Sequence, residues 1–137
     1  MTERPNFSCR YRVYWEDTDA GGVVYYANFL KFMERCRTEW LRHLGVNQQQ
    51  LRLERRMQFA IASVTVNFLL PAVLDDEITV TAELERLGGA TIQFKQTIWR
   101  ADVQLIDAGT RVACLDSDSL KPRAIPKDLF AEWRNGQ

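Results

Sequence analysis

The hydrophobic period of the chain changes along its length, and this change limits the possible folds more than any other feature. Between residues 26 and 44, large apolar side chains recur every three or four positions, which predicts an amphipathic helix of about five turns. These residues are Tyr26, Phe29, Leu30, Met33, Cys36, Trp40, Leu41 and Leu44, with Gly45 as the expected C-cap. From residue 59 onward the period falls to two, which is typical of half-buried strands.

One strand is expected before the helix and four after it. Tyr11, Val13 and Trp15 share one parity, so residues 7–15 predict a half-buried first strand. The later strands are expected at residues 59–68 with a slip in parity near Ala62-Ser63, at 78–84, at 92–98, and after Ala108-Gly109 through Asp116.

Turn signals separate these segments. Gly88-Gly89 predicts a hairpin turn, Asn47 is expected to cap a short helix, and Pro126 is expected to begin a C-terminal helix holding Leu129, Phe130 and Trp133. Because the connections between strands are short, antiparallel pairing is favoured. The pattern predicts a single α+β domain over residues 1–137, in which an antiparallel sheet of about five strands wraps around a long central helix.

Charge and composition exclude several classes of function. The net charge is zero, which argues against a general nucleic-acid binder but leaves room for a local basic patch. No apolar run approaches the ~18 residues needed to span a bilayer. Because residues 1–8 lack the apolar stretch of a signal peptide, a cytoplasmic protein is expected. Zero net charge together with 11% aromatic residues favours a homo-oligomer that hides apolar surface.

The residues that most often bind metals are sparse. The three cysteines, Cys9, Cys36 and Cys114, are widely spaced, and His43 is the single histidine. These residues do not have the spacing of zinc ligands, so neither a metal nor another cofactor is expected. Free structural thiols in a reducing compartment are the favoured interpretation.

An acidic turn precedes the predicted helix. Glu16, Asp17 and Asp19 lie close to Gly21-Gly22, directly before the apolar stripe begins. Carboxylates next to a helix N-terminus are a plausible site for hydrolysis, because a carboxylate can activate water and free N–H groups can bind an anion. The same acids are also consistent with ordinary turn residues that bond locally, or with a site for a divalent metal ion.

With these features in place, the sequence resembles a known family. The segment Glu16 to Tyr25, read as EDTDAGGVVY, together with the helix and the antiparallel sheet, is similar to the hotdog-fold acyl-CoA thioesterases. It closely resembles the YbgC-type branch associated with the Tol-Pal system, which is related to the 4-hydroxybenzoyl-CoA thioesterases. Further matching segments are Arg12-Val13-Tyr14, Glu34-Arg35, Arg37-Thr38-Glu39, Leu120-Lys121-Pro122-Arg123 and Ile125-Pro126-Lys127.

The resemblance implies roles for particular residues. Asp19 is the implied catalytic carboxylate, acting on the thioester directly or through a water, and the backbone N–H of Tyr26 is the implied donor to the thioester carbonyl. Val24 and Tyr25 are expected substrate contacts. Lys121 and Arg123 are expected to meet the phosphates of coenzyme A, although solvated surface charge is an equally good interpretation. The resemblance also implies a homodimer with sites at its interface, often paired into tetramers, and an acyl chain held between sheet and helix.

Two positions depart from the YbgC-type pattern. Tyr26 stands where most members carry His, and Trp15 stands where they often carry Tyr. The implied donor is the backbone N–H of this residue, so it is kept when the side chain changes from His to Tyr. The 4-hydroxybenzoyl-CoA branch also carries an aromatic residue at this place. The expected function is therefore hydrolysis of an acyl-CoA to a carboxylic acid and coenzyme A.

Two other functions are compatible with parts of this pattern. A hotdog dehydratase needs a histidine near the helix start, and none is present there. A non-catalytic module would bind acyl-CoA or acyl-carrier protein near an envelope complex, and the missing histidine favours it. Release of thiol from acyl-CoA substrates of different chain lengths separates this module from an enzyme.

Overall fold

Within residues 7–131 the fold consists of five strands and one long helix, with three short helical segments between them. In a computed structural model, the structure describes residues 7–131. In chain order the elements are β1 (Phe7–Arg12), η1 (Trp15–Asp17), α1 (Asn28–His43), α2 (Gln48–Gln50), η2 (Leu51–Arg55), β2 (Met57–Phe68), β3 (Glu77–Leu87), β4 (Thr91–Arg100) and β5 (Val103–Asp116). No helix within residues 7–131 is long and apolar enough to cross a membrane.

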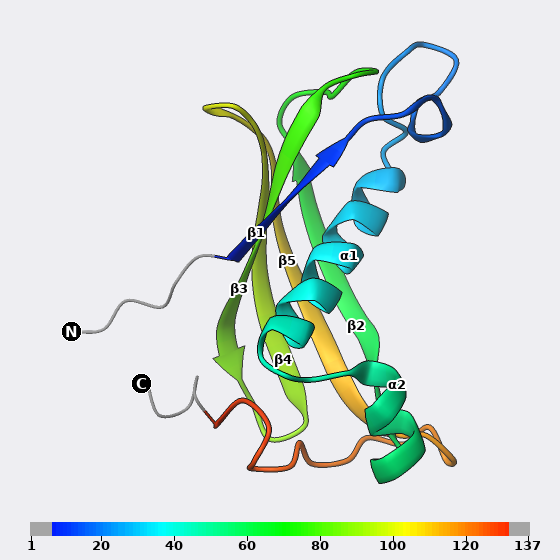
Figure 1. The fold of residues 1–137 in the computed structure, drawn as a ribbon, viewed down its shortest axis with the longest axis vertical. Helices are drawn as coiled ribbons and strands as arrows, with labels where there is room; N and C mark the ends of the chain where they lie inside the picture. The colour runs from blue at the N-terminus through cyan, green and yellow to red at the C-terminus, as the bar shows by residue number, and fades with distance from the viewer. Residues whose placement is uncertain (1–6, 132–137) are drawn as a thin grey trace, which may run out of the picture.

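All five strands form one antiparallel sheet in the order β1-β3-β4-β5-β2. The sheet curls around α1, which lies along one of its faces (Figure 1). The predicted α+β hotdog architecture is therefore confirmed. The acidic turn lies at the end of the molecule where α1 begins, and α2 and the segment after β5 lie at the opposite end (Figure 1).

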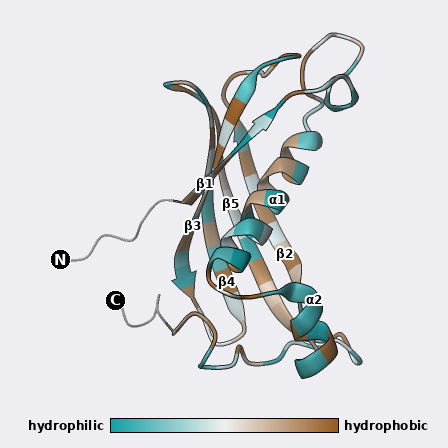
Figure 2. Cartoon of the chain, viewed as in Figure 1, coloured by the Kyte–Doolittle hydropathy of each residue, from teal (hydrophilic) through white to brown (hydrophobic). Residues whose placement is uncertain are grey.

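The core lies between α1 and the sheet. Apolar side chains alternate along β3 and β4, and they meet the apolar stripe of α1, whose other face is polar (Figure 2). The indole of Trp40 packs edge-on against Phe94, with ring centroids 5.2 Å apart. Burial of each large apolar side chain contributes about 1.5–3 kcal/mol, so the stripe fixes which face of α1 turns inward. Its buried members are Phe29, Phe32, Met33, Cys36, Trp40 and Leu41.

The register of β2 against β5 shifts between Ile61 and Ser63, which confirms the slip in parity predicted near Ala62-Ser63. The prediction that Ala108-Gly109 precedes the last strand is wrong. Both residues lie inside β5, where Gly109 pairs with Lys95 on one side and Thr65 on the other. The turn between β4 and β5 is instead at residues 101–102, where Ala101 adopts a φ of 52°. This turn was not predicted because its residue at positive φ is an alanine, and the sequence therefore has no glycine to mark it.

The first strand is shorter than predicted, and the extension to Trp15 is wrong. β1 ends at Arg12, and the Val13 N–H bonds to the carbonyl of Asp76 at 2.9 Å. The chain then bends through η1, which leaves Trp15 77% exposed instead of half-buried. At the other end, residues 127–130 after Pro126 form a turn, and Trp133 lies outside the described residues.

Candidate active site

The acidic turn is a miniature antiparallel ladder. Thr18 bridges Val24, the Asp19 N–H donates to the carbonyl of Val23 at 2.8 Å, and the Tyr25 N–H donates to the carbonyl of Asp17 at 2.9 Å. Gly22 sits at the tip with a φ of 83°, a conformation that glycine adopts without strain. The ladder places Asp17 opposite Tyr25, close to the start of α1, and Asp19 opposite Val23, two rungs nearer the tip of the turn.

The carboxylate of Asp19 is held by one oxygen. Its Oδ1 accepts a hydrogen bond from the Gly21 N–H at 2.8 Å. A Cβ at Gly21 would lie 3.2 Å from this same oxygen, so glycine gives the carboxylate the room to approach the backbone. Asp19 is exposed, and its Oδ2 has no hydrogen-bond partner within residues 7–131. The turn therefore orients the acid and leaves one oxygen available to a water or a substrate.

Asp17 has a different environment from Asp19. Its Oδ2 accepts the N–H of Tyr14 at 2.8 Å, and its carbonyl accepts both the Tyr25 N–H and the Asn28 side-chain amide at 2.9 Å. These three hydrogen bonds join the segment after β1, the ladder and the first residue of α1. Asp17 therefore shapes the turn, as the sequence suggested.

The start of α1 is uncapped. Ala27 already has helical angles, with φ −67° and ψ −21°, and it has no side chain that could cap the helix. The first turn contains no acidic residue, whereas Arg42 and His43 complement the dipole at the other end. In the described part of the chain, the N–H groups of Tyr26 and Ala27 have no hydrogen-bond acceptor. The positive end of the helix is thus open beside the Asp19 turn.

The predicted substrate contacts differ in exposure. The rings of Tyr25 and Tyr26 are exposed and pack together, with centroids 4.8 Å apart. Hydrogen bonding with Tyr26 raises the pKa of the Tyr25 hydroxyl above its usual value. Val24 is buried in the core, and its N–H bonds to the carbonyl of Ala72 at 2.8 Å. Tyr26 also meets Phe68 edge-on, with a centroid separation of 6.1 Å.

A loop after β2 supports the turn, and this long-range contact was not predicted from the sequence. Val73 bridges Val23, and the Val73 N–H donates to Asp76 Oδ2 at 2.9 Å. Arg100 donates from Nη1 both to the same Asp76 oxygen at 3.0 Å and to the carbonyl of Pro71 at 3.1 Å. Arg100 and Asp76 are 24 positions apart in the chain, so no local pattern could have paired them.

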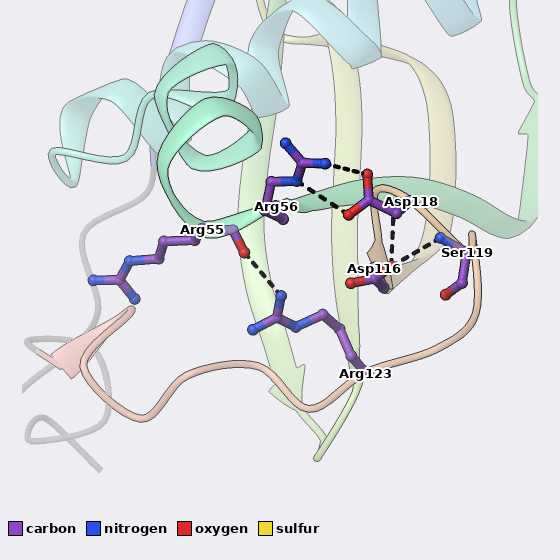
Figure 3. Close-up of polar contacts among 6 residues, drawn as sticks. All are labelled: Arg55, Arg56, Asp116, Asp118, Ser119 and Arg123. Atoms are coloured by element: carbon purple, nitrogen blue, oxygen red, sulfur yellow. Dashed lines mark hydrogen bonds and ion pairs between the residues drawn. The ribbon is translucent and has the colours of Figure 1, made fainter.

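Lys121 and Arg123 lie at the other end of the fold from Asp19 and Tyr26. Arg123 donates through its backbone N–H to the carbonyl of Cys114 and through its guanidinium to the carbonyl of Arg55 (Figure 3). β2 alone separates the two ends by roughly 36 Å, at 3.3 Å per residue. A single copy of the chain therefore does not bring all the predicted site residues together.

The basic residues near Arg123 are largely paired. Arg55 binds both carboxylate oxygens of Asp128. Arg56 binds both carboxylate oxygens of Asp118 (Figure 3). Within residues 7–131, no group of three or more His, Cys, Asp or Glu side chains is arranged to hold a metal ion. The chemistry that the described site offers on its own is that of a carboxylate beside backbone donors.

A long helix wrapped by a curled antiparallel sheet defines the hotdog class of proteins, and this chain adds an acidic turn before the helix. Residues 21–106 match the model of the Thioesterase superfamily, and the chain belongs to this family.

Individual relatives agree with this assignment. The chain is 43% identical to the acyl-CoA thioesterase YbgC of Haemophilus influenzae over 94% of its own length and 95% of the relative. It is 44% identical to the acyl-CoA thioester hydrolase YbgC of Escherichia coli O157:H7, over 90% and 92% of the two chains.

Solved structures share the fold. A probable thioesterase from Bartonella henselae superposes with a TM-score of 0.80 at 32% identity, covering 90% of this chain and all of that one. A 4-hydroxybenzoyl CoA thioesterase mutant in complex with 4-hydroxybenzoyl CoA superposes with a TM-score of 0.85 at 18% identity, over 92% and 96% of the chains. The second likeness concerns the fold alone.

Proposed function

We propose that this thioesterase hydrolyses an acyl-CoA to a carboxylic acid and coenzyme A, with Asp19 as the catalytic carboxylate and the Tyr26 N–H as the oxyanion donor. The observation that carries the proposal is the oriented Asp19 carboxylate, with one oxygen free, beside the uncapped start of α1. The acyl-CoA activity of the YbgC relatives supports the choice of substrate.

The reaction follows from these two groups. Asp19 takes a proton from a water that attacks the thioester carbon, or its carboxylate attacks that carbon and forms an anhydride that water then opens. In both routes the carbonyl oxygen becomes an oxyanion, which the Tyr26 N–H stabilises. One such donor typically contributes about 10²–10³ in rate. The C–S bond then breaks, and the thiolate of coenzyme A leaves and takes up a proton.

The active unit that we propose is a homodimer formed through β2, alone or as half of a tetramer. β2 is an edge of the sheet, and large apolar side chains are exposed along it and the following loop. The opposite edge, β1, carries Arg10 and Arg12, charges that discourage pairing. The exposed apolar residues are Ile61, Val64, Phe68, Leu69, Leu70 and Val73, at 41–53% exposure.

A two-fold axis at β2 makes the two copies of this strand antiparallel. The Phe68 end of one copy then approaches the Met57 end of the other, and the separation between Asp19 and the basic end of the fold is bridged in trans. Lys121 and Arg123 of the second copy are the groups proposed to meet the phosphates of the bound coenzyme A. A cavity of about 130 Å³, lined by Arg37, Leu41 and Phe94 among others, supports an acyl site between helix and sheet.

The proposed location is the cytoplasm, which the three unpaired cysteines support. Acyl-carrier protein presents the same thioester as coenzyme A and is the second proposed substrate carrier. A binding module that lacks turnover is the alternative function, and Tyr26 in place of histidine is the feature that favours it.

The decisive experiment replaces Asp19 by Asn and measures thiol release across a series of acyl-CoA chain lengths. We expect Asp19→Asn to lower kcat by at least about 10²-fold, because it removes the base or nucleophile while keeping an oxygen for the Gly21 N–H. Tyr26→Phe is expected to stay within about threefold of wild type, because the donor belongs to the backbone.

Asp102→Asn is the matched control, since it makes the same exchange at an exposed turn. Unchanged turnover in Asp19→Asn would refute the proposed role of this carboxylate. A wild-type protein that binds acyl-CoA but releases no thiol at any chain length would favour the binding module.

A further inference from the structure

Asn28 is the first residue of α1, and its side chain points back to the acidic turn. Its Nδ2 donates to the carbonyl oxygen of Asp17 at 2.9 Å, in a half-buried contact. The same oxygen accepts the Tyr25 N–H. Asn28 is therefore part of the junction where the ladder meets the helix.

This junction lies between the two proposed catalytic groups. Asp17 is two positions before Asp19 on the first arm of the ladder, and Asn28 is two positions after Tyr26 at the helix start. A hydrogen bond between Asp17 and Asn28 therefore fixes the arm that carries the acid against the turn of helix that carries the donor. Within residues 7–131, it is the single side-chain hydrogen bond between α1 and residues 14–25.

Other contacts of α1 fix the helix farther along. The Cys36 Sγ donates to the carbonyl of Val80 at 3.3 Å, and Gln96 Nε2 donates to the carbonyl of Met33 at 3.1 Å. Both are at least one turn beyond the first residue of the helix. The ring of Phe29 contacts Phe68, but an apolar contact sets position less strictly than a directional bond.

We propose that Asn28 is a positioning residue for thioester hydrolysis, and that its amide sets the distance between the Asp19 carboxylate and the N–H of Tyr26. This inference rests on the proposed function of those two groups. Asn28 acts through Asp17 and the helix start, so its loss changes the geometry of the reaction and leaves the binding of coenzyme A in place. A displacement of about 1 Å in such a constellation can lower the rate by about 10²-fold.

The test is Asn28→Leu, which keeps the size of the side chain and removes both amide donors. We expect kcat to fall at least about tenfold with KM within about threefold of wild type, measured with the acyl-CoA that the wild-type protein turns over fastest. Asn47→Leu is the matched control: the Asn47 side chain also makes one hydrogen bond to backbone, accepting the Gln50 N–H at 3.0 Å, but Asn47 lies beyond the far end of α1. Its kcat should be unchanged.

A double-mutant cycle separates positioning from a general loss of structure. If Asn28 serves only to position Asp19, the variant carrying both Asp19→Asn and Asn28→Leu should be no slower than Asp19→Asn alone. Additive losses, an unchanged kcat in Asn28→Leu, or a rise in KM alone would each overturn the inference. If Asn28→Leu does not fold, Asn28→Ala gives the same test with a smaller side chain.

The two proposals fail in different ways. Turnover that survives Asp19→Asn refutes the catalytic assignment itself. An inactive Asp19→Asn together with a fully active Asn28→Leu refutes only the positioning role.

Discussion

Two buried polar side chains of the sheet have opposite hydrogen-bonding states. Gln96 is fully buried, and it donates to the carbonyls of Met33 and Thr81 while accepting from the Arg37 guanidinium at 2.8 Å. Thr110 is 1% exposed, and its hydroxyl is one of the buried side-chain groups of residues 7–131 that lack a hydrogen-bond partner. Gln96 thus joins the middle of α1 to the sheet, whereas the Thr110 hydroxyl makes no compensating bond.

These states predict stability changes of opposite sign. Gln96→Met should lower the free energy of unfolding by about 1–3 kcal/mol, because it leaves Arg37 without its acceptor. Thr110→Val keeps the shape and removes an unsatisfied hydroxyl, so it should be neutral or stabilising by about 1 kcal/mol. Urea unfolding of both variants at pH 7 measures the two changes. Equal destabilisation by both would contradict this account.

Single residues of the site could be predicted when the signal was local. Asp19 and the two glycines form one short turn, and that turn was recognisable from the sequence. The supporting pair of Arg100 and Asp76, and the contact from Gln96 to Met33, join distant parts of the chain and follow only from the folded sheet. Trp15 was misassigned because parity alone cannot show where a strand ends; η1 turns that side chain outward.

At the scale of elements, an ion pair between Arg55 and Asp128 attaches the segment after β5 to η2. The Arg55 guanidinium lowers the pKa of the Asp128 carboxyl through hydrogen bonds and charge. Because the folded pKa lies below the unfolded value of about 3.9, this contribution is complete above that pH. It is lost as the pH falls through the lower folded value.

The corresponding prediction concerns Asp128→Asn. The variant should be less stable than wild type at pH 7, and the difference should vanish at acidic pH, where both carry a neutral side chain. Because the pair is exposed, added salt should also reduce the difference. Urea unfolding at several pH values and two salt concentrations measures it. A difference that persisted at the lowest pH would point to lost packing instead of lost charge.

Elements whose hydrophobic pattern repeats over many residues were predictable, but the residues at which they end were less so. The stripe of α1 and the alternation of β3 and β4 extend over many residues, so helix and strands were assigned correctly. The boundaries of β5 were missed because Gly109, a residue common in turns, lies inside a strand that is paired on both sides. The true turn at Ala101 contains no glycine.

At the scale of the whole molecule, the exposed edge of β2 predicts self-association. Val64→Lys should shift the protein to a monomer and lower turnover, because it places a charge on the apolar edge where the second copy is proposed to pair. Sedimentation velocity and thiol release measure the two effects. Ser8→Lys adds the same charge to the exposed edge strand β1 and should leave both unchanged. A Val64→Lys protein that remained dimeric and active would refute this interface.

The order of the strands also governs how the protein is made. β2 pairs with β5 and with no other strand of the sheet, yet β3 and β4 are synthesised between them. On the ribosome, β2 must therefore wait with its apolar residues unpaired until almost the whole domain has emerged. A chain stopped before β5 loses the strand that connects β2 to the rest of the sheet, and it leaves an unprotected edge open to aggregation.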